Sequence, residues 1–205
     1  MKKAFALLLA AALLVTMAAC TGTAPAATTA PAETTAPAET AAPAPAETEA
    51  SKTYTVGICQ LVQHPALDAA TEGFKAALTE ALGDSVKFDE QNASGESANC
   101  PTIINGFVAS KVDLIMANAT PALQAAQSAT NEIPVLGTSV TEYGVALGLT
   151  DFSGTVGGNI SGTSDLAPLD QQADMIVEWM PNAKKVGLLY CSAEANSQYQ
   201  VDEVQ

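Results

Sequence analysis

The stretch from Asp113 to Val140 constrains the fold of this chain most, because a short helix-like segment lies there between two runs of strand length. Asp113–Ala117 is apolar after its first residue, and Ile133–Gly137 is a second apolar run. Between them, Pro121 suits the first turn of a helix, where no backbone N–H is needed, and Ala122–Ala129 continues the helical pattern. The order of strand, helix and strand predicts a βαβ unit with two parallel strands.

Polar residues follow both predicted strands of this unit. Asn118, Ala119 and Thr120 come after the first strand, and Thr138 and Ser139 come after the second. In open parallel sheets, ligands bind outside the carboxyl ends of the strands, so we expect both polar ends to face one crevice, the candidate binding site. Thr120 is also predicted to be the N-cap of the helix, because its hydroxyl can accept an orphan backbone N–H.

The alternation of strands and helices begins earlier in the chain and occurs at least three times. Tyr54–Ile58 and Val86–Asp89 have the composition of strands, a helix is predicted over Leu67–Ala81, and Pro101 opens another. Repeated strand–helix units predict an α/β fold, in which helices cover both faces of a doubly wound parallel sheet.

The alternation loosens after Tyr143 and then starts again. The predicted elements are a possible strand over 146–149, a glycine-rich loop over 151–158, an extended connection over 159–165, a helix over 169–179 with Trp179 in the core, and a buried strand over 186–190 followed by a helix. We expect residues 52–165 to be a first lobe and residues 166–205 to begin a second α/β lobe that continues past Gln205.

The first 51 residues differ from the rest of the sequence. Lys2 and Lys3 precede the apolar run Ala4–Val15, and small residues lead to Cys20, a pattern typical of a secretory signal over residues 1–20. The Ala-Ala-Cys ending resembles a bacterial lipobox, in which Cys20 is lipidated; the alternative is a chance cysteine after an ordinary signal. Residues 21–51 consist mainly of Thr, Ala, Pro and Glu, which predicts a disordered tether.

The charge of the chain excludes one class of partner and restricts how a ligand is bound. The formal net charge is −14 and the eight cationic residues are all lysines, spread along the sequence. Without a basic patch, nucleic acid is not an expected partner. Without arginine, an anionic ligand group must be held by helix N-termini, backbone N–H groups or hydroxyls.

Cysteine and histidine usage predicts neither a metal site nor a cofactor. Cys59, Cys100 and Cys191 have no zinc-binding spacing, and His64 is the single histidine. We interpret the three cysteines as small buried hydrophobic residues. A disulfide between Cys59 and Cys100 remains the alternative.

Six separated motifs carry a resemblance to a known family. They are His64–Asp68, Asp113–Ile115, Ala119–Pro121, Ile133–Val135, Asn159–Asp165, and Leu189–Tyr190 with Glu194–Ser197. Together they resemble the lipoprotein substrate-binding proteins of ABC transporters, in particular the group that includes tryptophan and tyrosine binders. The resemblance implies two α/β lobes of the type I periplasmic-binding-protein kind, with the ligand in the cleft between them. The sequence departs from the family at Glu142-Tyr143 and Cys191-Ser192, where Asp-Pro and Asn-Pro are common.

The resemblance also implies a set of ligand-binding residues in both lobes. These are Gln60, His64, Ala119, Thr120, Thr138, Ser139, Ser164 and Asp165 in the first lobe and its hinge side, and Glu194, Asn196 and Ser197 in the second. Some have simpler interpretations. His64 precedes Pro65 and is alternatively a helix cap, and Asp165 and Glu194 are alternatively solvated surface acids.

These observations favour binding over catalysis. The sequence contains no G-x-S-x-G motif, no zinc cluster and no phosphate-binding loop, and His64 has no recognisable nucleophilic partner. We expect a monomeric, extracytoplasmic, lipid-anchored binding component of an ABC importer, which captures a small solute for a permease and its ATPase. An amino acid is the expected ligand, with an aromatic one favoured. The alternatives are a tethered ligand sensor for a signalling partner, or a binder of another small organic solute.

Overall fold

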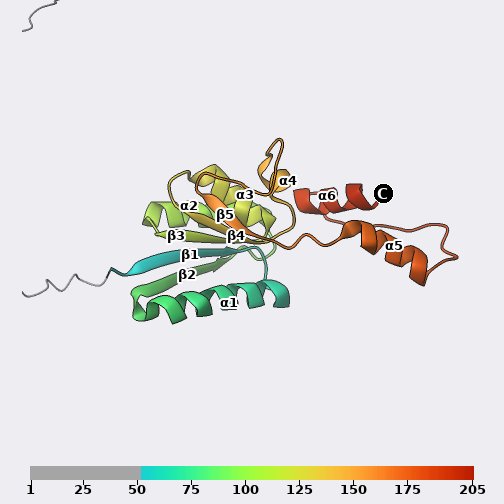
Figure 1. Cartoon of the computed structure of the whole chain (residues 1–205). Helices are drawn as coiled ribbons and strands as arrows, with labels where there is room; N and C mark the ends of the chain where they lie inside the picture. Colours follow the sequence, from blue (N-terminus) through green and yellow to red (C-terminus); the bar gives the residue numbers. More distant parts are fainter. Residues whose placement is uncertain (1–51) are drawn as a thin grey trace, which may run out of the picture. The chain divides into compact units, whose positions relative to one another are not determined.

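The computed structural model describes residues 52–205, which contain a five-stranded parallel sheet (Figure 1). Its strands lie in the order β2-β1-β3-β4-β5, and every neighbouring pair is parallel. Their bounds are β1 Tyr54–Gln60, β2 Val86–Asn92, β3 Leu114–Asn118, β4 Val135–Val140 and β5 Ile160–Ser164. The predicted α/β fold and its central βαβ unit, β3-α3-β4, are confirmed. The predicted signal, Cys20 and the tether lie outside the described residues.

Helices cover both faces of this sheet, as the alternation predicts. They are α1 Pro65–Leu82 on one face, and α2 Cys100–Ser110 and α3 Thr120–Ala129 on the other (Figure 1). A hydrophobic core lies on each face of the sheet, and successive residues of β1 belong to different cores. Ile58 packs with Phe74 of α1, whereas Cys59 packs with Ile104 of α2 and Leu123 of α3. This follows from the two-residue period of a strand, which sends neighbouring side chains to opposite faces.

The prediction that Thr120 is the N-cap of α3 is wrong. The helix begins at Thr120 itself, and the preceding Ala119 has a φ of 92°. The N–H groups of Ala122 and Leu123 both donate to the Ala119 carbonyl oxygen, at 3.1 Å each. The chain turns sharply from β3 into α3, so a backbone carbonyl takes the role that was assigned to the threonine hydroxyl.

Two predictions around Tyr143 need correction. The possible strand over 146–149 is absent, and α4 extends over Tyr143–Leu147 instead. The Glu142 carboxylate caps this helix by accepting hydrogen bonds from the Gly144 N–H at 2.9 Å and the Val145 N–H at 2.6 Å. Residues 159–165, interpreted as an extended connection, contain the strand β5. This strand pairs with β4, and the register of the pair shifts between Gly137 and Val140.

Residues 166–205 contain two helices, α5 Leu169–Trp179 and α6 Ala195–Val204. The predicted helix over 169–179 is confirmed, whereas the buried strand over 186–190 is wrong: these residues form no strand, and Leu189 is fully exposed. A strand needs a neighbour to receive its backbone hydrogen bonds, and none lies beside this segment among the described residues. The core assignment of Trp179 and the burial of Cys191 are also wrong, since both are exposed.

Candidate functional site

The carboxyl ends of β1, β3, β4 and β5 bring the first-lobe candidates to one edge of the sheet. Three backbone hydrogen bonds connect these ends: Leu61 N–H to Asn118 O at 3.2 Å, Ala119 N–H to Thr138 O at 3.0 Å, and Asp165 N–H to Val140 O at 3.1 Å. Gln60, Ala119, Thr120, Thr138, Ser139, Ser164 and Asp165 therefore all lie at or next to this edge. The predicted convergence of the polar strand ends is confirmed, and the ligand-binding crevice at this edge stays a prediction.

A buried polar network lies at the centre of the edge. The Gln60 amide nitrogen donates to Asp68 Oδ1 at 2.6 Å, and its amide oxygen accepts from Thr71 Oγ1 at 2.6 Å. The Asn118 amide nitrogen donates to Thr71 Oγ1 at 2.9 Å and to the Leu67 carbonyl at 2.8 Å. These bonds attach α1 to the ends of β1 and β3, so Gln60 and Asn118 hold the edge rigid. Asp68, Thr71 and Asn118 were not predicted as site residues, although Asn118 belongs to the polar strand end.

Two side-chain oxygens at this edge are buried without a hydrogen-bond partner among residues 52–205: Asn118 Oδ1 and Thr120 Oγ1. Thr120 is only 2% exposed and Asn118 is not exposed at all. An unsatisfied buried polar group costs about 1–3 kcal/mol. Unsatisfied buried oxygens of this kind indicate a position where another molecule, either a ligand or an ordered water, donates the missing hydrogen bond.

Hydroxyl groups from β4 and β5 continue the edge. Thr138 and Ser139 are partly exposed, and Ser139 has a φ of 54°, which belongs to the irregularity of β4. Thr163 Oγ1 donates to Thr138 Oγ1 at 3.4 Å. Ser164 is already engaged, because its hydroxyl donates to the Thr141 carbonyl at 2.7 Å and accepts the Leu166 N–H at 3.2 Å. Thr138 and Ser139 are therefore better placed than Ser164 to contact a ligand.

Asp165 lies beside the buried Tyr143. Burial and the negative charge of Asp165 raise the pKa of the Tyr143 hydroxyl to about 12, and that hydroxyl donates to the Thr163 carbonyl at 3.3 Å. The tyrosine is therefore a neutral donor at physiological pH. It holds β5 against β4 and leaves the exposed Asp165 carboxylate at the sheet edge.

His64 has the capping role that was the alternative to ligand binding. Its Nδ1 accepts a hydrogen bond from the Ala66 N–H at 3.2 Å, and the residue is exposed at the start of α1. Next to it, an open polar pocket of about 590 Å³ extends from Gln60 towards β2. Two carboxylates of this pocket, Glu72 and Glu90, are ion-paired with Lys75 at 3.0 and 2.8 Å.

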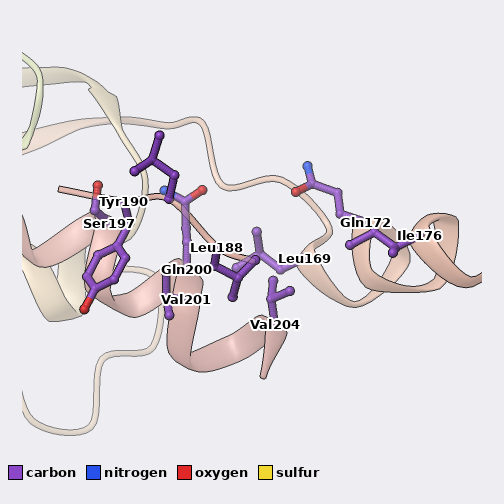
Figure 2. A pocket seen from close by; sticks show the side chains of 10 residues that line it. Leu169, Gln172, Ile176, Leu188, Tyr190, Ser197, Gln200, Val201 and Val204 are labelled. Carbon is purple, nitrogen blue, oxygen red and sulfur yellow. The ribbon is translucent and has the colours of Figure 1, made fainter. Parts of the chain in front are cut away.

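The other three candidates, Glu194, Asn196 and Ser197, lie at the start of α6. Ser197 lines an apolar pocket of about 280 Å³ formed by residues between 169 and 204 (Figure 2). The Glu194 carbonyl accepts the N–H groups of Ser197 and Gln198, and Asn196 Oδ1 is buried without a partner among the described residues. The structure therefore does not bring Glu194, Asn196 and Ser197 into one pocket with the residues of the sheet edge.

Residues 52–205 contain no cluster of three or more His, Cys, Asp or Glu side chains arranged to hold a metal ion. Within the same range, no helix has the length and apolarity required to cross a membrane.

Comparison with known proteins identifies the family. The sequence model of the ABC transporter substrate binding protein family matches residues 55–205, so the chain belongs to this family. Proteins of this family bind solutes outside the cytoplasm, and the predicted family resemblance is confirmed.

Individual relatives agree with this assignment. A tyrosine-binding protein from Clostridioides difficile (strain R20291) is 42% identical over 161 residues, covering 77% of this chain and 46% of its own length. A conserved domain protein from Vibrio cholerae O1 biovar El Tor is 36% identical with a TM-score of 0.69. An ABC domain from Streptococcus pneumoniae, solved in complex with L-Trp, is 37% identical with the same TM-score of 0.69. Both structures cover 75% of this chain, which spans 52% of theirs. The chain therefore spans about half the length of these relatives.

Proposed function

We propose that this protein is the solute-binding component of an ABC importer and that it binds an amino acid, with an aromatic one favoured. The observation that carries this proposal is the buried, unpartnered Thr120 hydroxyl at the start of α3, on the sheet edge where ligands bind in parallel α/β folds. The names of the relatives support the ligand class, since one is a tyrosine-binding protein and another was solved with L-Trp.

The carboxylate of the amino acid binds at the start of α3. The positive end of the helix dipole lies there, and it favours an anion. Pro121 has no N–H and the Ala122 N–H already donates to Ala119, so the Thr120 hydroxyl, rather than a row of free amides, is the main donor of this turn. Thr138 and Ser139 on the neighbouring strand add further hydroxyls. This arrangement suits a chain that has no arginine.

The ammonium group of the ligand requires a carboxylate. Asp165 is exposed at the end of β5, and Glu194 lies at the start of α6. Neither forms an ion pair among residues 52–205. A charge-assisted hydrogen bond contributes about 1.5–3 kcal/mol. We assign this role first to Asp165, because it shares the sheet edge with Thr120 and Thr138. Glu194 is the second candidate, and it requires the two regions to approach one another.

Titration calorimetry of the full-length protein against the twenty amino acids tests this assignment, with simple sugars as competing ligands. Thr120→Val keeps the side-chain shape and removes the hydroxyl. We expect affinity for the preferred amino acid to fall about tenfold, which corresponds to about 1.4 kcal/mol. The ligand-free variant should be no less stable than the wild type, because the lost hydroxyl has no partner in the described structure.

Thr102→Val is the matched control, since Thr102 is an exposed threonine at the start of another helix. It should leave affinity unchanged. Tight binding of a sugar, or equal affinity of the Thr120→Val variant and the wild type, would contradict the assignment. Loss of affinity in an Asp165→Asn variant, compared with Glu194→Gln, identifies the partner of the ammonium group.

The proposal includes the membrane anchor and the transport partners. Cys20 is lipidated, residues 21–51 form the tether, and a single copy delivers its ligand to a permease and its ATPase without catalysing a reaction. The lipobox-like Ala-Ala-Cys sequence and the Thr/Ala/Pro/Glu segment support this proposal. Cys20→Ala should move the protein from the membrane fraction to the soluble fraction and leave ligand affinity unchanged. A variant that still sediments with membranes would rule out the lipid anchor.

A further inference from the structure

Helix α2 crosses β1 in a register that places two cysteines face to face. The Phe107 ring lies directly over Gly57, where an added Cβ would come within 2.6 Å of the ring. Cys100 lies two helical turns before Phe107 on the same face of α2, and Cys59 lies two residues after Gly57 on the same face of β1. Since α2 runs against the direction of β1, Cys100 meets Cys59 at the carboxyl end of the strand.

The two thiols lie in one buried cluster, inaccessible to solvent, and both are free in this structure. Both residues have an exposed fraction of 0% and belong to the core between the sheet, α2 and α3. Interaction with Cys100, together with burial, raises the pKa of Cys59 above its ordinary value, and interaction with Cys59 lowers the pKa of Cys100. Nearby, the Asn99 amide donates to the Ala93 carbonyl at 3.1 Å and the Ala93 N–H donates to the Gln60 carbonyl at 2.9 Å, so the start of α2 is tied to the end of β1.

We propose that Cys59 and Cys100 are a disulfide-forming pair, oxidised when the protein folds outside the cytoplasm. Members of this family act outside the cytoplasm, where thiols are oxidised more readily than in the cytosol. The register of α2 over β1 and the shared buried cluster support the proximity that such a bond requires. Cys191 is not part of the pair, because it is exposed and lies in the segment between α5 and α6.

The chemistry is thiol–disulfide exchange with a protein oxidant that carries a disulfide. One cysteine thiolate attacks the oxidant's disulfide to form a mixed disulfide, and the second thiolate displaces the oxidant's remaining thiol. Two electrons and two protons pass to the oxidant, which leaves as a dithiol. Because both thiols are inaccessible in the folded state, the exchange takes place before α2 docks on β1. The bond then fixes the end of β1, next to Gln60.

Peptide mapping of the exported full chain tests the pairing. Free thiols are blocked with N-ethylmaleimide in intact cells, and the protein is then unfolded and digested with trypsin without reductant. Cleavage after lysines separates peptide 53–75, which contains Cys59, from peptide 88–111, which contains Cys100. We expect these two peptides to be recovered as one cross-linked species that reductant separates, and Cys191 to carry the maleimide. Recovery of both peptides singly with blocked cysteines, or cross-linked to Cys191, would overturn the proposal.

Thermal unfolding with and without reductant gives an independent measurement. Reduction should lower the melting temperature of the wild type by about 5–15 °C, as expected for the loss of one native disulfide in a domain of this size. The Cys59→Ala, Cys100→Ala double variant should show no response to reductant, whereas Cys191→Ala should respond like the wild type. If the double variant does not fold, the wild-type and Cys191→Ala data still decide: an unchanged melting temperature in reductant contradicts the disulfide. None of these results depends on the identity of the ligand.

Discussion

Two apolar segments of this chain differ in secondary structure and in burial. Leu114–Asn118 forms β3 in the middle of the sheet, where Ile115 and Ala117 are fully buried. Val186–Tyr190 is similarly apolar, yet it forms no strand and is exposed throughout. The two segments differ in their strand partners. β3 pairs with β1 on one side and β4 on the other, whereas no segment among residues 52–205 pairs with 186–190. An apolar pattern therefore predicts a strand only where the chain also provides partners for its backbone.

The largest expected difference between these segments is in amide hydrogen exchange. Amides of β3 open only through global or near-global unfolding, because their hydrogen bonds lie between two strands and under α1 and α3. Amides of residues 186–190 have no strand partner and should exchange within the first time points. We expect protection factors in β3 to exceed those of 186–190 by at least about a thousandfold. Equal protection would mean that the later segment is paired in solution, and it would remove the contrast.

Paired truncations of apolar side chains measure the same difference as free energy of unfolding. Ile115→Ala removes a fully buried side chain between β3 and the α2–α3 core and should cost about 2–5 kcal/mol. Leu189→Ala removes a side chain that is fully exposed and should change stability by no more than about 0.5 kcal/mol. Chemical denaturation followed by circular dichroism gives both values. A large loss in the Leu189→Ala variant would show that this side chain packs in solution.

The same contrast explains how much of the structure was predictable from the sequence. The strand–helix alternation predicted β1 to β4 and α1 to α3, because those segments combine a clear period with Pro or Gly at their ends, but it did not predict β5. It did not predict α4, which depends on the Glu142 carboxylate accepting two N–H groups. Nor did it predict the exposure of Trp179, because a helical apolar stripe does not reveal whether anything packs against it.

The shared position of the polar strand ends was predictable from the sequence, whereas the hydrogen-bonding role of each side chain was not. Polar residues after strands indicated the sheet edge, since all carboxyl ends of parallel strands share one side. The hydrogen bonds of that edge depend on side chains far apart in sequence, such as Asn118 with Thr71, at 2.9 Å, and Gln60 with Asp68, at 2.6 Å. The assignment of Thr120 as a helix cap was wrong because the Ala119 carbonyl accepts the N–H groups of the first turn, and the threonine hydroxyl has no hydrogen-bond partner among residues 52–205.

The smallest expected effect is a pH dependence confined to the sheet region, at the end of the strands opposite the candidate site. Asp113 Oδ2 accepts the Thr55 N–H at 2.9 Å, and Asp113 Oδ1 lies 3.3 Å from Lys52 Nζ. The hydrogen bond from Thr55, and then the lysine charge, hold the pKa of Asp113 below its ordinary value. A carboxyl group whose pKa is lower in the folded state stabilises the fold above its unfolded pKa of about 3.9, and this stabilisation is lost as the pH falls through the folded pKa.

Asp113→Asn should therefore lower the denaturation midpoint at pH 7 slightly and make the midpoint less sensitive to acid than that of the wild type. The difference in denaturation midpoint between the wild type and the variant should decrease as the pH falls from about 5 to 2, because protonation removes the stabilisation that the wild-type carboxylate provides. Hydrogen exchange at pH 5 should show the change in β1 and β3, which this side chain connects, and leave residues 186–190 unaltered. A midpoint difference that stays constant down to pH 2 would show that Asp113 acts through its shape and not through its charge.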